Sequence, residues 1–125
     1  MDDCLFCKII KKEIPADIVH EDEHVVAFKD IYPKAPVHIL LVPRIHIESA
    51  RDITEDNKGT VGDLILHARY VADKLNLPGY KLAFNVGKAG GQVVPHIHLH
   101  LLGGWDASPK QEQGGSVPES GLAQV

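Results

Sequence analysis

The segment that most constrains this chain is HIHLHLL at residues 96–102, in which histidine alternates with apolar residues. Alternate side chains of a strand point to the same face, so the three histidines would line one face while Ile97, Leu99 and Leu101 enter the core. On a helix, residues two positions apart do not face each other. The pattern therefore predicts a strand that carries a row of imidazoles.

Three interpretations of this row stay open on the residues alone. A solvent-facing polar strand accounts poorly for three of the chain's 8 histidines falling within five positions. A metal site is the second, because imidazole is the commonest metal ligand, although no carboxylate follows within the strand. The third is nucleophilic catalysis at phosphorus by a neutral imidazole. We favour the third, because Asn85, Gln92 and the glycine-rich loop 87–91 offer amide groups to an anion.

The remaining pattern predicts one domain of the α+β class. Apolar spacing predicts a short helix over residues 4–12 and a long helix over residues 54–77. Runs rich in branched residues predict strands at residues 18–20, 25–28, 37–42, 81–86 and 93–102. Residues 106–125 are rich in Gly, Ser, Pro and Gln. We therefore expect a domain over residues 1–105 followed by a flexible tail.

Composition argues against several classes of partner. The chain has 125 residues and a formal net charge of −4, whereas binding to nucleic acid depends on clustered Lys and Arg. No apolar run approaches the roughly 20 residues of a membrane helix, and the N-terminus lacks the features of a secretory signal. We therefore expect a cytoplasmic protein that binds neither nucleic acid nor membrane.

The histidine segment also fits the pattern His-φ-His-φ-His-φ-φ, where φ is apolar. Together with KIIKKEIPA, VVAFKDIYPKAPVHILLVPRIH and FNVGKAGGQVVPHIHLHLLGG, it identifies the chain as a member of the histidine-triad (HIT) family, and it resembles the Hint branch of nucleoside phosphoramidases. The resemblance covers roughly residues 4–104. It implies a HIT-like fold with a five-stranded antiparallel sheet, one long helix and one short helix. It also implies a homodimer with the long helix at its interface.

The resemblance assigns catalytic roles to four histidines. His98 would be the nucleophile, and His100 would form a hydrogen bond to the phosphate or the leaving group. His96 would help to hold the array, and His38 matches an additional histidine of the pocket. Without the resemblance, His38 is better explained as a buried core histidine.

The resemblance also implies a set of nucleotide contacts. Asp30 would accept both ribose hydroxyls, although on its own it is typical of a turn. Ile31 and Phe28 would contact the base. The phosphate contacts would come from Asn85, Gly91, Gln92 and the backbone of Val93, with His98 and His100.

The pair Cys4-x-x-Cys7 resembles the N-terminal cysteines of HIT proteins that carry zinc. In those proteins two histidines complete the site, and they match His46 and His96. Such a Cys₂His₂ set is an ordinary tetrahedral zinc site. We expect one structural zinc per subunit and no catalytic metal. The alternative is a pair of reduced, partly buried thiols.

The predicted activity is hydrolysis of purine nucleoside phosphoramidates, or of related nucleotidyl bonds, at the α-phosphorus through a covalent nucleotidyl-histidine on His98. The substrate or product is a purine nucleotide of the AMP or GMP type. Dinucleoside polyphosphate hydrolysis, nucleotidyl transfer and a nucleotide-binding interaction module remain alternatives. Two departures from the Hint pattern, Val93 in place of a frequent Ser and Trp105 in place of a common Arg, bear on leaving-group protonation and specificity.

Overall fold

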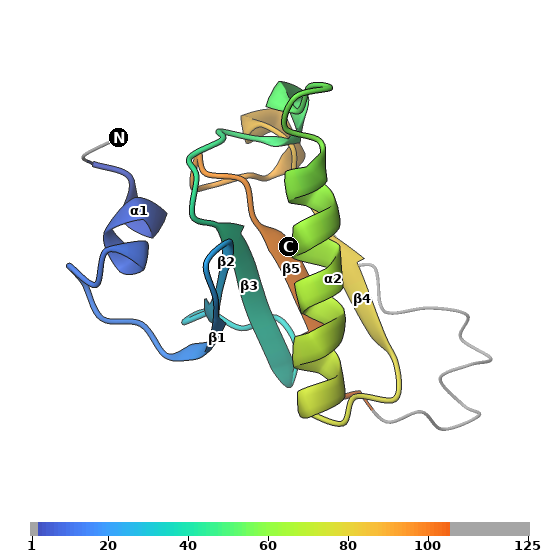
Figure 1. Ribbon diagram of the computed structural model, residues 1–125. Helices are drawn as coiled ribbons and strands as arrows, with labels where there is room; N and C mark the ends of the chain where they lie inside the picture. The colour runs from blue at the N-terminus through green and yellow to red at the C-terminus, as the bar shows by residue number, and fades with distance from the viewer. Residues whose placement is uncertain (1–2, 106–125) are drawn as a thin grey trace.

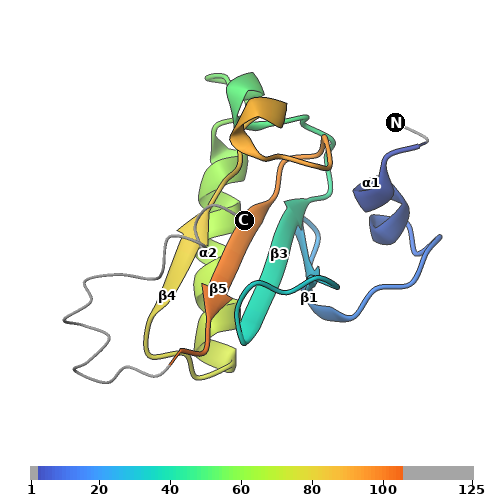
Figure 2. The ribbon, with the colours of Figure 1, turned by 180° about the vertical axis from the view of Figure 1, so that it is seen from behind.

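The computed structural model describes residues 3–105, which form one sheet with a helix on each face. A five-stranded antiparallel sheet carries the helix α2 on one face and the short helix α1 on the other (Figures 1 and 2). The predicted α+β class, the five strands and the two helices are therefore confirmed. The expected tail, residues 106–125, lies outside the described residues.

Within residues 3–105, the last strand along the chain is inserted into the middle of the sheet. The strand order is β1-β2-β3-β5-β4, and every pair is antiparallel. The strands are β1 (Ile18–Glu21), β2 (Val25–Lys29), β3 (Val37–Pro43), β4 (Tyr80–Ala83) and β5 (Leu99–Gly103). Because β5 has a neighbour on each side and a covered layer above and below, all five of its residues are buried.

Helix α2 (Gly59–Lys74) covers one face of the sheet. Its apolar side packs against alternate residues of the central strands, and Leu99 and Leu101 of β5 face it as expected. The buried residues of this core are Val25, Ala27, Ile39, Leu41, Leu64, Ala68, Val71, Ala72, Leu99 and Leu101. Within residues 3–105, no helix has the length and hydropathy needed to cross a membrane.

Helix α1 (Leu5–Ile10) packs on the opposite face. Its side chains Phe6, Cys7 and Ile9 contact a second apolar set formed by Val26, Phe28, Leu40 and Val42. These strand residues alternate with those that face α2, as the period of two in a strand requires. His38 and His100 therefore lie on the α1 side, because they occupy the same parity as Leu40 and Leu102.

Two element boundaries differ from the predicted ones. The long helix begins at Gly59 because residues 54–57 form a turn, in which the Thr54 N–H donates to Asn57 Oδ1. The histidine strand begins only at Leu99, since the His96 N–H donates to the Val94 carbonyl and folds the preceding segment into a turn. His96 and His98 thus precede β5. Two short 3₁₀ helices, Ala50–Asp52 and Lys88–Gly90, flank this region.

Candidate functional site

A cavity of about 580 Å³ opens on the α1 side of the sheet. Its size is in the range of small-molecule sites. The residues assigned to the site from the sequence that line it are Phe28, Asp30, Ile31, His38, Asn85, Gly91, Val93, His98 and His100. Gln92 and His96, which were assigned to the same site, do not line this cavity.

A hydrogen bond fixes which of the two ring nitrogens of His98 carries the proton. Its Nδ1 lies 2.7 Å from the carbonyl oxygen of His96, an acceptor, so Nδ1 carries the proton and donates it. Nε2 of His98 then keeps its lone pair. Burial lowers the pKa of His98, although the His96 carbonyl opposes this shift. The side chain is therefore a neutral imidazole with a nucleophilic nitrogen at the cavity.

His100 is held in the opposite tautomer through His38. The Lys34 N–H donates to His38 Nδ1 at 3.0 Å, so His38 carries its proton on Nε2. That Nε2–H donates to His100 Nδ1 at 2.9 Å. The proton of His100 therefore resides on Nε2, a buried atom with no hydrogen-bond partner within residues 3–105. Since His100 lines the cavity, this N–H can donate to a ligand there.

Burial keeps these rings neutral. It lowers the pKa of His100 to about 3, and the neighbouring His98 and His38 add to the shift. It also lowers the pKa of His38, against the effect of the Asp30 carboxylate, whose Oδ2 lies 3.4 Å from His38 Nε2. The other carboxylate oxygen of Asp30 accepts the Tyr32 N–H at 2.8 Å. Asp30 is thus a turn residue and a cavity residue at once.

Phe6 belongs to the site, although the sequence pattern marked it only as an apolar helix residue. Its ring meets that of His98 edge to face, with centroids 5.0 Å apart and an interplanar angle of 90°. It also packs against Phe28 at 5.4 Å. Its position between two cysteines was the only available signal. Other lining residues that were not predicted are Leu5, Ile9, Ile14, Tyr32 and Lys34.

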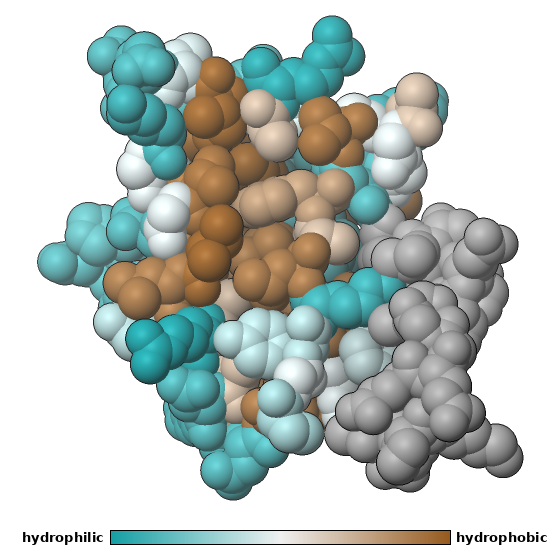
Figure 3. Space-filling view, turned by 90° about the vertical axis from the view of Figure 1, so that its right-hand side faces the viewer, coloured by the Kyte–Doolittle hydropathy of each residue, from teal (hydrophilic) through white to brown (hydrophobic). Residues whose placement is uncertain are grey.

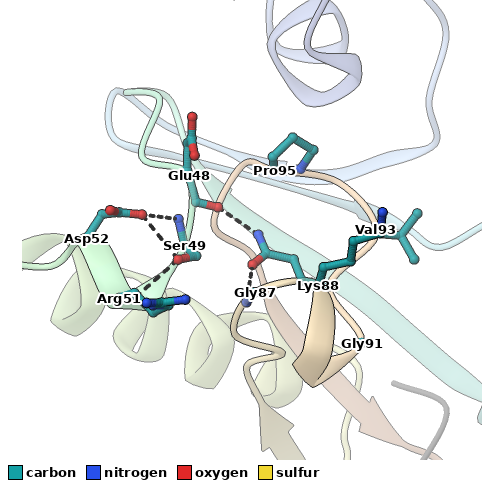
Figure 4. A pocket seen from close by; sticks show the side chains of 10 residues that line it. Glu48, Ser49, Arg51, Asp52, Gly87, Lys88, Gly91, Val93 and Pro95 are labelled. Atoms are coloured by element: carbon teal, nitrogen blue, oxygen red, sulfur yellow. Dashed lines mark hydrogen bonds between the residues drawn. The ribbon is translucent and has the colours of Figure 1, made fainter.

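The side chain of Gln92 holds the glycine-rich loop instead of facing the cavity. Its amide nitrogen donates to the carbonyls of Glu48, at 2.7 Å, and Val94, at 3.0 Å. Its oxygen accepts the Gly87 N–H at 2.9 Å. These bonds border a second, open hollow of about 790 Å³ (Figure 4). Arg51 and Lys88 also line this hollow.

The loop does not form the converging cradle of N–H groups that its glycines suggested. The N–H groups of Gly90, Gly91 and Gln92 donate to carbonyls of Gly87 and Lys88 within the loop itself. Gly91 has a φ of 92°, a conformation that favours glycine. The next N–H, that of Val93, makes no hydrogen bond within the described residues, and its side chain is 88% exposed. Because Val93 lines the cavity, its N–H is the candidate backbone donor for a ligand there.

His96 points away from the cavity, so the three histidines do not share one surface. Its ring is fully buried, and its Nε2 donates to the Pro43 carbonyl at 2.9 Å. Nδ1 therefore carries the lone pair, 3.5 Å from Cys4 Sγ and 3.6 Å from Cys7 Sγ. The expectation of a three-membered row on one strand face is corrected to a pair, His98 and His100. Only the backbone carbonyl of His96 contributes to that pair.

Cys4, Cys7, His46 and His96 form a cluster, here called the Cys₂His₂ cluster, whose ligand atoms all lie within 4.8 Å of one another. The two Nδ1 atoms are 3.1 Å apart, and Cys7 Sγ is 3.4 Å from His46 Nδ1. Ligands around a tetrahedral zinc ion are separated by about 3.3 to 3.8 Å. Two imidazole nitrogens this close require a proton or a cation between them.

The chemistry of the cluster also fits a metal. Both cysteines are free and buried. Burial and the adjacent Cys4 raise the pKa of the Cys7 thiol, so the thiolate that binds a metal needs the charge of the ion itself beside it. The Pro43 carbonyl orients His96 as an outer partner orients a metal-binding histidine. The Cys7 N–H donates to Cys4 Sγ at 3.4 Å, which also begins helix α1.

Comparison with known proteins agrees with this geometry. A family model described as "Scavenger mRNA decapping enzyme C-term binding" matches residues 3–113. The purine nucleoside phosphoramidase of Escherichia coli strain K12 is 43% identical over 110 residues, which are 86% of this chain and 92% of that protein. The chain belongs to the histidine-triad family. The resemblance stated from the sequence motifs is thereby confirmed, and so is the general class of hydrolase.

Solved structures confirm the histidine-triad fold. A HIT family hydrolase from Clostridium thermocellum has a TM-score of 0.82 and 48% identity, with 87% of this chain and 96% of that chain covered. A zinc-bound histidine triad family protein from Mycobacterium smegmatis has a TM-score of 0.75 and 29% identity over 98% of this chain and 94% of its own.

Proposed function

We propose that this protein hydrolyses purine nucleoside phosphoramidates at the α-phosphorus through a covalent nucleotidyl-histidine on His98. The observation that carries the proposal is the pairing of opposite tautomers. The lone pair on His98 Nε2 and the unpartnered N–H on His100 Nε2 belong to rings whose centroids are 5.0 Å apart in one cavity. Attack at phosphorus needs such a nucleophile beside a donor for the developing negative charge.

In the proposed complex, a purine nucleotide enters this cavity in one orientation. The base lies against Ile31 and Phe28, and the ribose hydroxyls donate to the Asp30 carboxylate. The α-phosphate lies near Asn85, Gly91 and the N–H of Val93. Gln92 supports this stretch through its backbone position and its bonds to the loop.

The reaction has two displacements. His98 Nε2 attacks the α-phosphorus, the bond from phosphorus to the leaving nitrogen breaks, and the leaving amine takes up a proton from solvent water, which the hydrolytic water of the second step returns. The Nε2–H of His100 stabilises the charge on a phosphate oxygen during this step. Water then attacks the same phosphorus, the bond to His98 breaks, and a nucleoside monophosphate leaves.

We infer that the Cys₂His₂ cluster holds one structural zinc ion per subunit. Cys4, Cys7, His46 and His96 supply two sulfur and two nitrogen ligands, a set typical of closed structural sites. A closed site leaves no position for substrate, so the ion's part is to fix helix α1 against the segment before β5. No catalytic metal enters the proposed reaction.

We also propose that the protein is a cytoplasmic homodimer. The edge strand β4 and helix α2 border a surface on which apolar side chains gather (Figure 3). Ile65, Leu66 and Tyr70 of α2 and Leu82 of β4 are each between 39% and 47% exposed. Exposed apolar surface next to an unpaired sheet edge is typical of a subunit interface.

The deciding experiment is acid-quenched mass spectrometry with an adenosine phosphoramidate. We expect a nucleotidyl adduct on the peptide that contains His98, and no adduct in His98→Asn. An adduct on any other residue would refute the assignment. A guanosine phosphoramidate, run in parallel, gives the base preference.

Dinucleoside polyphosphate hydrolysis or nucleotidyl transfer is the second candidate. It is favoured by the open hollow that adjoins the cavity at Gly91 and Val93 and carries Arg51 and Lys88. These cations could contact additional phosphates beyond the α-phosphate. A higher kcat/KM for a diadenosine polyphosphate than for the phosphoramidate would select this reaction. Retained nucleotide binding with negligible turnover on every substrate would instead indicate an interaction module.

A further inference from the structure

A second cluster of metal-ligating side chains lies away from the cavity and from the Cys₂His₂ cluster. It contains His20 of β1, Asp22 of the β1–β2 turn and His67 of α2, with ligand atoms all within 4.8 Å of one another. His20 pairs with Ala27, which faces α2. The cluster therefore lies on the α2 side of the sheet, opposite the candidate active site.

His67 presents both ring nitrogens to acceptors. Its Nδ1 is 2.7 Å from the carbonyl oxygen of Asp63, and its Nε2 is 2.5 Å from Asp22 Oδ2. A neutral imidazole has one N–H and can donate to only one of them. The contact with Asp22 thus needs either a second proton on the ring or a cation in its place.

His20 supplies a nitrogen that the rest of the fold does not use. Its Nε2 is buried and has no hydrogen-bond partner within residues 3–105, and its ring centroid is 5.4 Å from that of His67. Burial, followed by the proximity of His67, lowers the pKa of His20, which keeps the ring neutral, so that it can place its proton on Nδ1 and its lone pair on Nε2. This buried nitrogen, which lies beside the His67–Asp22 contact, is therefore a candidate metal ligand.

We propose that His20, Asp22 and His67 form a second site for a divalent zinc-type ion, which links helix α2 to the β1–β2 hairpin. Two imidazole nitrogens and one carboxylate oxygen, completed by water, are an ordinary zinc ligand set. On binding, the ion replaces the Nε2 proton of His67, which is released to solvent, and the Nε2–Oδ2 distance between His67 and Asp22 lengthens from the 2.5 Å of a hydrogen bond to the roughly 3.3 Å of two zinc ligands. This site is independent of the activity proposed for His98.

Neighbouring groups hold the three ligands in position. Oδ1 of Asp22 accepts the N–H groups of His24 and Val25, both at 2.8 Å, which leaves Oδ2 for the ion. The Nδ1–H bond from His67 to the Asp63 carbonyl orients the ring, as the outer partner of a metal-binding histidine does. The Asp22 side chain is 35% exposed, so the ion can enter from solvent.

Two cations close by lower the expected affinity without blocking the site. Lys74 Nζ donates to the Val19 carbonyl at 3.0 Å, and Arg44 Nε donates to the Asp22 carbonyl at 2.7 Å. Both donate to backbone oxygens and neither forms a hydrogen bond to the three ligand atoms. We therefore expect weaker binding here than at the Cys₂His₂ cluster.

Cobalt titration of the full-length, metal-stripped protein tests the proposal. We expect two equivalents per chain, the first with a thiolate-to-cobalt absorption band and the second without it. His20→Gln should remove the second step or weaken it by at least about tenfold, while it keeps the first. His20 is the residue to change because its Nε2 makes no hydrogen bond that the fold would lose.

His24→Gln is the matched control, since His24 lies on the same turn with an exposed side chain outside the cluster. It should retain both steps. Zinc added beyond the first equivalent should also raise the Tm of the unaltered protein and of His24→Gln, and not that of His20→Gln. A titration that ends at one equivalent, or a second step unchanged in His20→Gln, would overturn the proposal.

Discussion

His98 and His96 are two residues apart, yet they lie in opposite environments. The Nδ1–H of His98 donates a hydrogen bond to the His96 carbonyl, which leaves the lone pair on Nε2 at the cavity. The Nε2–H of His96 donates a hydrogen bond to the Pro43 carbonyl, which leaves the lone pair on Nδ1, beside two sulfurs and His46. In each region a backbone carbonyl decides which nitrogen keeps a lone pair. The comparison shows that the position of a backbone carbonyl decides whether a histidine of this segment offers Nε2 or Nδ1 as its free nitrogen.

The largest expected effect is a loss of activity when His98, and not a residue of the Cys₂His₂ cluster, is changed. We expect His98→Asn to lower kcat/KM for the phosphoramidate by at least about 10³, because the nucleophile is removed. The Asn amide can still donate to the His96 carbonyl, so the free energy of unfolding should change little. Steady-state kinetics and urea unfolding measure the two quantities. A variant that retains a tenth of the activity would contradict the assignment.

The reverse pattern is expected for the Cys₂His₂ cluster. Cys4→Ser should lower the free energy of unfolding by about 3 kcal/mol, since a bound ion stabilises only the folded chain. Serine retains the cap at the start of α1, so the loss reports on the metal. Elemental analysis should show less zinc per chain. Equal zinc and equal stability in Cys4→Ser would mean that these thiols bind no ion.

We expect His100, which lines the cavity, to make the folded protein less stable at low pH. His100 is neutral in the folded protein, where burial lowers its pKa from 6.5 to about 3, but it takes up a proton in the unfolded chain. Stability is therefore lost as the pH falls from 6.5 towards 3, by about 2 kcal/mol at pH 5 from this residue. His100→Asn should show a shallower loss in denaturant unfolding between pH 7 and 5. An unchanged slope would exclude His100 as the source.

A smaller effect is expected at the ribose contact. Asp30→Asn keeps an acceptor for the Tyr32 N–H but loses one carboxylate oxygen. We expect KM to rise about tenfold with a smaller change in kcat, the cost of a charge-assisted hydrogen bond. A 2′-deoxy substrate is the control, because the substitution should matter less when a hydroxyl is already missing. Equal losses on both substrates would place Asp30 away from the ribose.

The smallest effect is expected at Val93. Val93→Ser adds a hydroxyl donor beside the cavity and should raise kcat by up to about threefold, as general-acid assistance strengthens. Val93→Ala is the matched control, because it shortens the side chain without adding a donor. Stability should stay within about 0.5 kcal/mol for both, since the side chain is 88% exposed. If kcat is the same in Val93→Ser and Val93→Ala, the added hydroxyl does not assist protonation of the leaving group.

Periodicity was sufficient to predict the helices, the five strands and the burial of Leu99 and Leu101. It failed at His96, because a turn bond from the His96 N–H to Val94 ends the alternation before β5 begins. Nothing in the local pattern indicates that contact. The family resemblance placed His96 both in the histidine array and with the cysteines, and the structure brings its ring to the cysteines.

The tautomers, and the places of Phe6 and Gln92, could not be predicted from the sequence. They depend on long-range partners: the Glu48 carbonyl for Gln92, and the Pro43 carbonyl for His96. His20 and His67 are 47 positions apart in sequence and meet only because α2 packs on the face of the sheet to which His20 belongs. Residue type suggested the candidate ligands, and tertiary structure decided which of them meet.

The insertion of β5 between β3 and β4 has a consequence for how the chain acquires its site. Residues 37–43 and 80–83 border a gap that only residues 99–103 can fill. Closing such distant pairings is slow, because the intervening loops must be ordered first. During synthesis, a chain that lacks this terminal strand has neither a finished sheet nor His100 in place. The ability to bind a nucleotide therefore arises in a single late event.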